Sequence, residues 1–107
     1  MSLEIFLEPK ELKNSIEIQK GSIVSKALKQ KKEGSLSLFA FDEGQALSEH
    51  TAPYDAFIYV FEGEAEIKVG ERENIVKEGQ AIALPKDIPH SVKAKKPFKM
   101  LLFMIKG

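Results

Sequence analysis

Hydrophobic and polar residues alternate along much of the chain, in short stretches separated by glycine, proline and acidic residues. The stretch Glu64–Val69 carries a charged residue at every second position and an apolar residue between. Successive side chains of a β-strand point to opposite faces of a sheet. This stretch therefore predicts a strand with one face in solvent and one buried. Ser35–Phe41 alternates in the same way between Gly34 and Gly44.

Other stretches also have the length and composition of strands. They are Ile16–Gln19, Ile23–Leu28, Ala56–Phe61, Glu73–Lys77, Ala81–Leu84, His90–Ala94 and Phe98–Ile105. Ala56–Phe61 is apolar on both faces, which predicts that both faces are covered. Pro9–Asn14 predicts a short helical turn. Short strands with frequent turn signals and almost no helix are typical of an all-β sandwich or barrel. Because the chain has neither Cys nor Trp, an immunoglobulin-type sandwich is disfavoured and a jelly-roll barrel is favoured.

Composition narrows the possible partners and compartments. The 107 residues predict one domain, 1–107, and the 16 basic residues equal the 16 acidic ones. A net charge of zero argues against nucleic-acid binding, which needs surplus positive charge, and gives no support for binding an anionic membrane. We expect no membrane helix, because no apolar run is long enough for one. We expect no signal peptide, because the first residues lack a basic start before an apolar stretch. The absence of Cys excludes disulfides and thiolate sites, so we expect a cytoplasmic protein.

Two histidines carry most of the recognisable chemistry. His50 ends a stretch that starts at Gly44, and His90 ends a stretch that starts at Gly79. Histidine titrates near neutrality and is a favoured ligand of transition metals. If the two stretches lie on neighbouring strands, both side chains point into one pocket.

The two-residue period of a strand predicts which neighbours share that pocket. Small alanines beside the two histidines leave volume at the mouth of the barrel, where a ligand fits. By the same period Glu49 and Asp55 point away from His50. The predicted ligand-binding pocket consists of His50, Ala52, Tyr54, Ala56, His90 and Val92.

The glycine and histidine spacing resembles the two motifs of the cupin superfamily. In the first motif Gly44, His50 and Gly63 match, whereas the second histidine slot holds Ala52 and the glutamate slot holds Ala56.

The second motif is matched by Gly79, Pro85 and His90. Asp87 replaces its glycine and Ala94 replaces its asparagine. The resemblance covers about two thirds of the chain and implies a double-stranded β-helix of the small, single-domain cupin 2 type. The core of that barrel would span residues 36–105, after an N-terminal extension at residues 1–20.

The resemblance also implies a metal site that has lost two of its four usual ligands. His50 and His90 would hold a divalent transition metal ion (Zn, Ni, Fe or Mn) weakly, with water in the other positions. The alternative is that no metal binds and that both histidines form hydrogen bonds to backbone or water. Asp87 either orients His90 or is a turn residue between two prolines.

Three functions stay open at this level, and whether the protein is an enzyme is one of the open points. The first is a small-molecule-binding or sensing barrel with a degenerate metal site. The second is a metal-dependent dioxygenase or isomerase that uses the two histidines. The third is a dimerising domain without a ligand. We expect a homodimer, because a second copy could cover two apolar features of the sequence. They are the aromatic residues Phe57, Tyr59 and Phe61, which could instead pack inside the sandwich, and the stretch Met100–Ile105, which is apolar on both faces.

Overall fold

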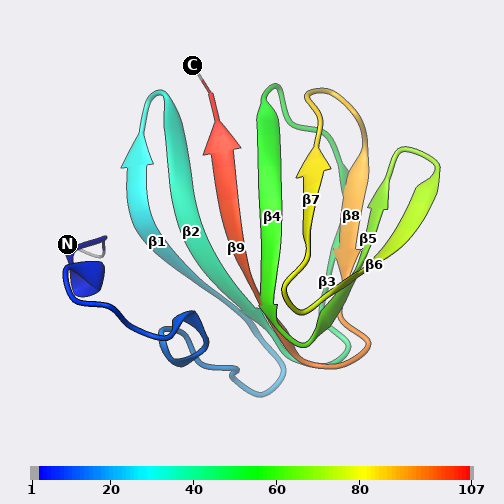
Figure 1. Cartoon of the computed structure of the whole chain (residues 1–107). Helices are drawn as coiled ribbons and strands as arrows, with labels where there is room; N and C mark the ends of the chain where they lie inside the picture. The colour runs from blue at the N-terminus through cyan, green and yellow to red at the C-terminus, as the bar shows by residue number, and fades with distance from the viewer. Residues whose placement is uncertain (1–2, 107) are drawn as a thin grey trace.

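The computed structural model describes residues 3–106, and its strands form two antiparallel sheets packed face to face (Figure 1). One sheet has the order β1-β2-β9-β4-β7 and the other β3-β8-β5-β6. The strands are β1 Ile23–Lys31, β2 Gly34–Phe41, β3 Ala46–His50, β4 Asp55–Glu62, β5 Glu64–Val69, β6 Arg72–Lys77, β7 Ala81–Leu84, β8 His90–Lys93 and β9 Phe98–Ile105. The predicted all-β jelly-roll fold is confirmed.

Most strands lie where the alternation of residues predicted them, but Ile16–Gln19 is not a strand. Two short 3₁₀ helices, η1 Leu3–Phe6 and η2 Leu12–Asn14, precede β1, and residues 15–22 form bends, a turn and irregular backbone outside any strand. Ile16 and Ile18 alternate because both pack on the outer face of the five-stranded sheet. Within residues 3–106, no helix is long and apolar enough to cross a membrane.

The main core lies between the two sheets. Phe41 of β2 and Phe98 of β9 are fully buried there, with stacked rings whose centroids are 4.6 Å apart. Alternate residues of β2, such as Leu38, point to the outer face instead, where they form a second cluster with the N-terminal segment, residues 3–22. The chain therefore buries apolar residues on both sides of its larger sheet.

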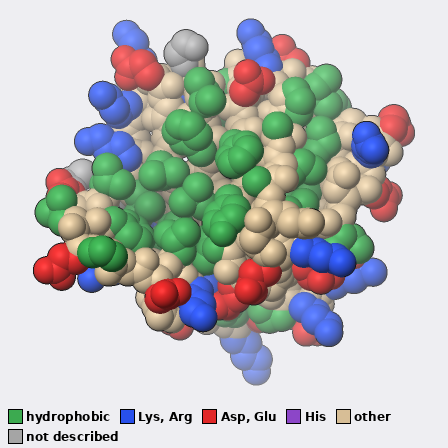
Figure 2. All heavy atoms as spheres, viewed as in Figure 1, with side chains coloured by type: hydrophobic (Ala, Val, Ile, Leu, Met, Phe, Trp, Pro, Cys, Tyr) green, Lys and Arg blue, Asp and Glu red, His purple; other side chains and the backbone are tan. Residues whose placement is uncertain are grey.

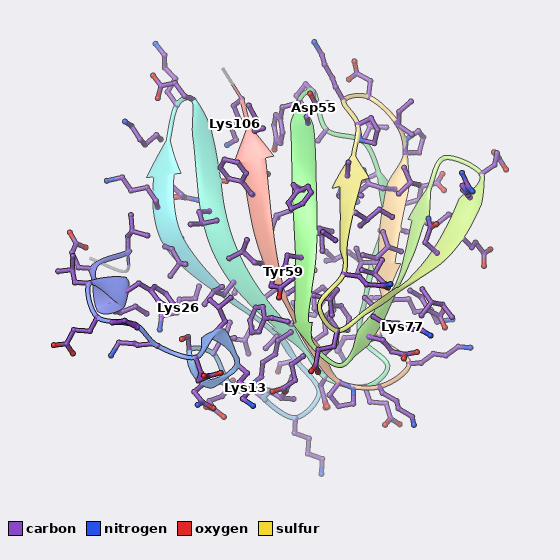
Figure 3. All side chains as sticks on the ribbon, viewed as in Figure 1. Lys13, Lys26, Asp55, Tyr59, Lys77 and Lys106 are labelled. Carbon is purple, nitrogen blue, oxygen red and sulfur yellow. The ribbon has the colours of Figure 1, made fainter. Side chains whose placement is uncertain are left out.

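Two lysines fasten the N-terminal segment to the sheet (Figure 3). Lys99 Nζ donates a hydrogen bond of 2.6 Å to the carbonyl oxygen of Lys13, and it lies 3.5 Å from Glu62. Lys26 Nζ donates a hydrogen bond to the carbonyl oxygen of Ser15. Lys99 is buried, so these contacts provide for its charge in place of water.

The N-terminal segment covers only part of this outer face. Tyr59 packs in the covered cluster, whereas Phe57, on the same face of β4, remains 44% exposed. The prediction that both faces of this strand are covered is therefore wrong at Phe57. Phe57 belongs to an apolar surface that has no covering element within the described chain.

Candidate functional site

Four connections between strands gather at one end of the barrel (Figure 1). They join β1 to β2, β3 to β4, β5 to β6 and β7 to β8, and we refer to this end as the barrel mouth. His50 is the last residue of β3 and His90 is the first residue of β8. The two strands are antiparallel neighbours, so both histidines lie at the mouth and face each other across one ladder.

A β-bulge sets the direction of His50. Leu47 pairs with Val92 and His50 pairs with His90, so three steps along β3 match two steps along β8. Leu47 packs against the core, and in a regular strand a residue three positions later would point to the opposite face. The extra residue in β3 reverses that parity. It thereby turns His50 to the same side as Leu47, over His90.

Backbone carbonyls determine which ring nitrogen of each histidine carries the hydrogen. His50 Nδ1 lies 2.7 Å from the carbonyl oxygen of Ser48, and His90 Nδ1 lies 3.2 Å from that of Ile88. A carbonyl oxygen can only accept, so each Nδ1 donates its hydrogen. In a neutral imidazole the other nitrogen, Nε2, then carries a free lone pair.

The two Nε2 atoms are 3.1 Å apart. Two lone pairs at that distance cannot form a hydrogen bond with each other. Both lone pairs gain a partner when a proton or a metal cation lies between the two nitrogens.

The two histidines differ in exposure. His50 is exposed, whereas His90 is only 6% exposed. Burial lowers the pKa of His90, the carbonyl of Ile88 opposes that shift, and the charge of His50 adds to it. The lowered pKa favours the neutral ring, so the Nε2 lone pair of His90 is available at neutral pH.

Comparisons with known proteins identify the family and the fold. A family model of the cupin domain matches residues 37–105. The chain belongs to the cupin family. A comparison with curated proteins finds no match for this cupin.

Solved structures resemble this cupin along nearly its whole described length. A conserved protein of unknown function from Streptococcus pyogenes is 32% identical with a TM-score of 0.90, and the match covers 94% of this chain and 89% of that one. A cupin superfamily protein from Desulfitobacterium hafniense is 27% identical with a TM-score of 0.89, covering 94% and 93%. A cupin 2 conserved barrel domain protein from Leptotrichia buccalis is 40% identical with a TM-score of 0.85, covering 89% and 46%.

Two further predicted pocket residues line the core below the mouth of this cupin. Val92 is buried and pairs with Leu47 on one side and Ile67 on the other. Ala56 is buried in the opposite sheet, where it pairs with Met104 and Leu84. Both belong to the apolar core, so neither offers a hydrogen bond to a bound molecule.

The other two predicted pocket residues belong to the connection between β3 and β4. The carbonyl oxygen of Ala52 accepts a 2.8 Å hydrogen bond from the N–H of Asp87, which joins two loops of the mouth. The ring of Tyr54 lies 5.2 Å from Lys106 Nζ, a cation–π contact at the end of β9. The second contact could not be predicted from local sequence, because Lys106 lies 52 positions beyond Tyr54 along the chain.

Asp87 acts as a turn residue of this cupin rather than as the group that orients His90. It has a φ angle of +63°, a left-handed conformation that aspartate tolerates better than most residues. It thus occupies the glycine position of the family motif with the backbone shape that glycine would supply. His90 Nδ1 forms its hydrogen bond with the carbonyl oxygen of Ile88 and not with the carboxylate of Asp87.

The neighbouring carboxylates have other partners. Glu49 Oε1 lies 3.8 Å from Lys68 Nζ, and Asp55 Oδ1 accepts a hydrogen bond from the N–H of Lys86. Within residues 3–106, no three His, Cys, Asp or Glu side chains gather in a way that could hold a metal ion. The two histidine nitrogens at the mouth therefore have no neighbouring carboxylate beside them to complete such a group.

Proposed function

We propose that this cupin is a small-molecule-binding or sensing protein that takes its ligand at the barrel mouth. In this proposal His50 and His90 hold a divalent transition metal ion weakly, and the ligand completes its coordination. The single observation behind the proposal is the convergence of two Nε2 lone pairs at 3.1 Å.

The separation of the two nitrogens fits a shared metal ion. Zinc–histidine bonds are about 2.0–2.1 Å long, so two nitrogens on one ion lie roughly 2.8–3.4 Å apart for angles from 90° to tetrahedral. The distance between the Nε2 atoms falls in that range. Each Nδ1 is already tied to a backbone carbonyl, as is usual for a histidine that binds metal through its other nitrogen.

The residues around the histidines support binding more than catalysis. A bound divalent ion would supply a positive charge that attracts a ligand oxygen or nitrogen. Ala56 and Val92 are apolar and buried, and His90 is itself only 6% exposed, so few groups near the metal could take part in a reaction. With only two protein ligands the ion would exchange easily, which suits a site that responds to the concentration of a metal or of its ligand.

A metal-dependent isomerase or dioxygenase at the same histidines is the second candidate. It is favoured by the same pair, because one neutral Nε2 can accept a proton while a protonated partner donates one. The carboxylates of Glu49 and Asp55 are held elsewhere, so they leave the imidazoles without an acidic partner. Turnover of a small substrate that disappears in His50→Ala would establish the enzyme and overturn the purely binding function.

Calorimetric titration of metal-depleted protein with Zn²⁺, Ni²⁺ and Mn²⁺ tests the site. We expect one ion per chain at micromolar affinity, and a loss of about tenfold or more in His50→Ala and in His90→Ala. Glu49→Gln is the matched control, since it removes a neighbouring carboxylate that points at Lys68 and should leave affinity unchanged.

A thermal-shift screen of small molecules, with and without the metal, then tests the binding function. A ligand that binds the folded state must raise the melting temperature. We expect stabilising compounds to lose their effect in both histidine variants. Metal affinity that is equal in wild type and both histidine variants would refute the site.

A further inference from the structure

Lys106 follows β9 at the barrel mouth, and its backbone extends the ladder with β2 by one residue. Its N–H donates a 2.7 Å hydrogen bond to the carbonyl oxygen of Glu33, one step beyond the pair of Gly34 and Ile105. Successive residues of a strand alternate between its two faces. Met104 packs against the main core, and the next residue, Ile105, is exposed. Lys106 therefore lies on the same face as Met104, the face that looks into the barrel.

The charge of Lys106 is held over the ring of Tyr54. Figure 3 labels Lys106 at the end of β9, and its Nζ lies 5.2 Å from the centroid of that ring. Within residues 3–106 no carboxylate forms an ion pair with Lys106, whereas carboxylates do pair with Lys68, Lys95 and Lys99. A cation over an exposed ring is held less strongly than a cation in a charge-assisted hydrogen bond with a carboxylate. The ammonium group can therefore exchange the ring for an anion at little cost.

Lys106 and the histidine pair belong to different sheets but to the same end of the barrel. His50 and His90 lie in the smaller sheet, and Lys106 follows the central strand of the larger sheet. Tyr54 lies on the connection that leads from His50 to the larger sheet. The two residues are four positions apart, so their Cα atoms lie within about 14 Å of each other. One small molecule can thus reach the histidine pair and the Tyr54–Lys106 contact together.

We propose that Lys106 binds an anionic group of the ligand taken at the barrel mouth, and that Tyr54 positions the ammonium group for it. This inference rests on the proposed binding function and adds the charge of the ligand. The carboxylates of Glu49 and Asp55 have other partners, so they neutralise neither Lys106 nor an ion at the neutral histidines. A small dicarboxylate would supply one carboxylate to each of these two places.

The rim of the mouth beside Lys106 also carries basic residues. Lys31 and Lys32 lie where β1 turns into β2, and Glu33 is the acidic residue of the same turn. Figure 2 shows basic side chains along the upper left margin of the molecule, beside β1. Clustered cations attract an anion as it approaches, and salt screens this attraction. The affinity for an anionic ligand should therefore fall as the concentration of NaCl rises.

Calorimetric titration with succinate and glutarate tests the proposal in metal-free and in zinc-loaded protein. At about pH 8 the imidazoles are neutral, so they cannot attract the probe by their own charge. We expect at least one of these dicarboxylates to bind and the corresponding diamide not to bind. Lys106→Gln should weaken binding about tenfold or more, because it removes a charge-assisted hydrogen bond. Lys106→Arg keeps the charge and should retain most of the affinity.

Two further sets of variants control for lost charge and for altered structure. Lys77→Gln removes an exposed lysine at the opposite end of the barrel and should bind the probe as wild type does (Figure 3). Tyr54→Phe keeps the ring and should also bind as wild type does, whereas Tyr54→Leu should bind several-fold more weakly. Equal affinity of Tyr54→Phe and Tyr54→Leu would refute the positioning role of the ring.

The outcomes separate this inference from the proposed metal site. Equal affinity of wild type and Lys106→Gln for the dicarboxylate would overturn the inference, even where zinc still binds. Equal affinity of wild type for dicarboxylate and diamide would overturn it as well, as would the absence of binding at millimolar probe. Lys106→Gln should leave zinc affinity unchanged, because the two histidines provide that site. Probe binding that depends on Lys106 in protein that takes up no zinc would support the anion site and refute the metal site.

Discussion

The imidazole rings of His50 and His90 stand edge to face, with centroids 4.3 Å apart and planes at 74°. This angle lets the two Nε2 atoms approach while each Nδ1 keeps its own carbonyl partner. The two Nε2 lone pairs therefore point at one place, where a single metal ion would bind both. The stability of the pair should depend on pH, because burial disfavours the protonated form of His90.

We expect the free energy of unfolding to fall as the pH drops below about 6.5, the pKa of histidine in an unfolded chain. Burial holds the pKa of His90 below that value, so the unfolded state binds a proton that the native state does not. The loss is at most about 1.4 kcal/mol for each pH unit, and it ends at the native pKa. Above pH 6.5, roughly, both states hold the neutral ring and this contribution is constant.

Urea unfolding of metal-free protein from about pH 5 to pH 8 measures this dependence. His90→Gln removes the buried titrating group and should flatten the curve in that window. Identical slopes for wild type and His90→Gln would show that the buried ring does not link folding to protonation.

Gly63→Ala should destabilise the protein more than Gly79→Ala. Both glycines have positive φ angles, +76° and +87°, so each substitution carries the cost of a left-handed alanine, about 1 kcal/mol. At Gly63 the added Cβ would also lie 2.6 Å from the carbonyl oxygen of Pro97, whereas at Gly79 it would meet nothing within 4 Å. We expect denaturant unfolding to show a difference of about 2 kcal/mol, and equal losses would contradict the clash.

Ser35→Ala should stabilise the protein. Ser35 is 4% exposed, and among the described residues its Oγ has no hydrogen-bond partner. An unsatisfied buried hydroxyl costs about 1–3 kcal/mol, and alanine removes that cost while losing one atom of packing. Thermal unfolding should therefore show a higher melting temperature, by a few degrees for a gain of about 1 kcal/mol. A lower melting temperature would mean that the hydroxyl has a partner, such as a buried water.

Lys99→Met should loosen the N-terminal segment. Methionine keeps much of the length of the buried side chain but cannot donate to the carbonyl of Lys13. We expect a loss of about 1.5–3 kcal/mol, the usual contribution of a charged hydrogen bond, and faster proteolysis within residues 3–22. Lys95→Met is the control, because the Lys95–Glu66 pair has a mostly exposed lysine and should contribute about 0.5 kcal/mol or less. Equal proteolysis of the two variants would argue against a fastening role for Lys99.

Strand positions could be predicted from the sequence because they depend on local alternation and turn residues. Glu64–Val69, Ala81–Leu84 and Phe98–Ile105 were predicted with the bounds that the structure has. Ile16–Gln19 alternates equally well but pairs with no strand. An alternating pattern shows only that one side of a segment is buried. A segment that packs on the face of a sheet has one buried side, just as a strand within the sheet does.

The geometry of the histidine pair could be predicted only in part. The sequence predicted that His50 and His90 share a pocket if their strands are neighbours, which they are. The bulge between Leu47 and His50, however, leaves no mark in a two-residue pattern. The carbonyls of Ser48 and Ile88 are backbone atoms, which every residue has, so residue types could not identify them as partners.

Strand β3 is a short edge strand whose only paired neighbour in its sheet is β8. The two imidazoles stand at the end of this single ladder, 40 positions apart in sequence. A metal ion or ligand bound between the two histidines would therefore link β3 to β8 at the end of their ladder. Amide hydrogens of β3 would then exchange with solvent more slowly in the bound protein than in the free protein, because the edge of the smaller sheet would open less often.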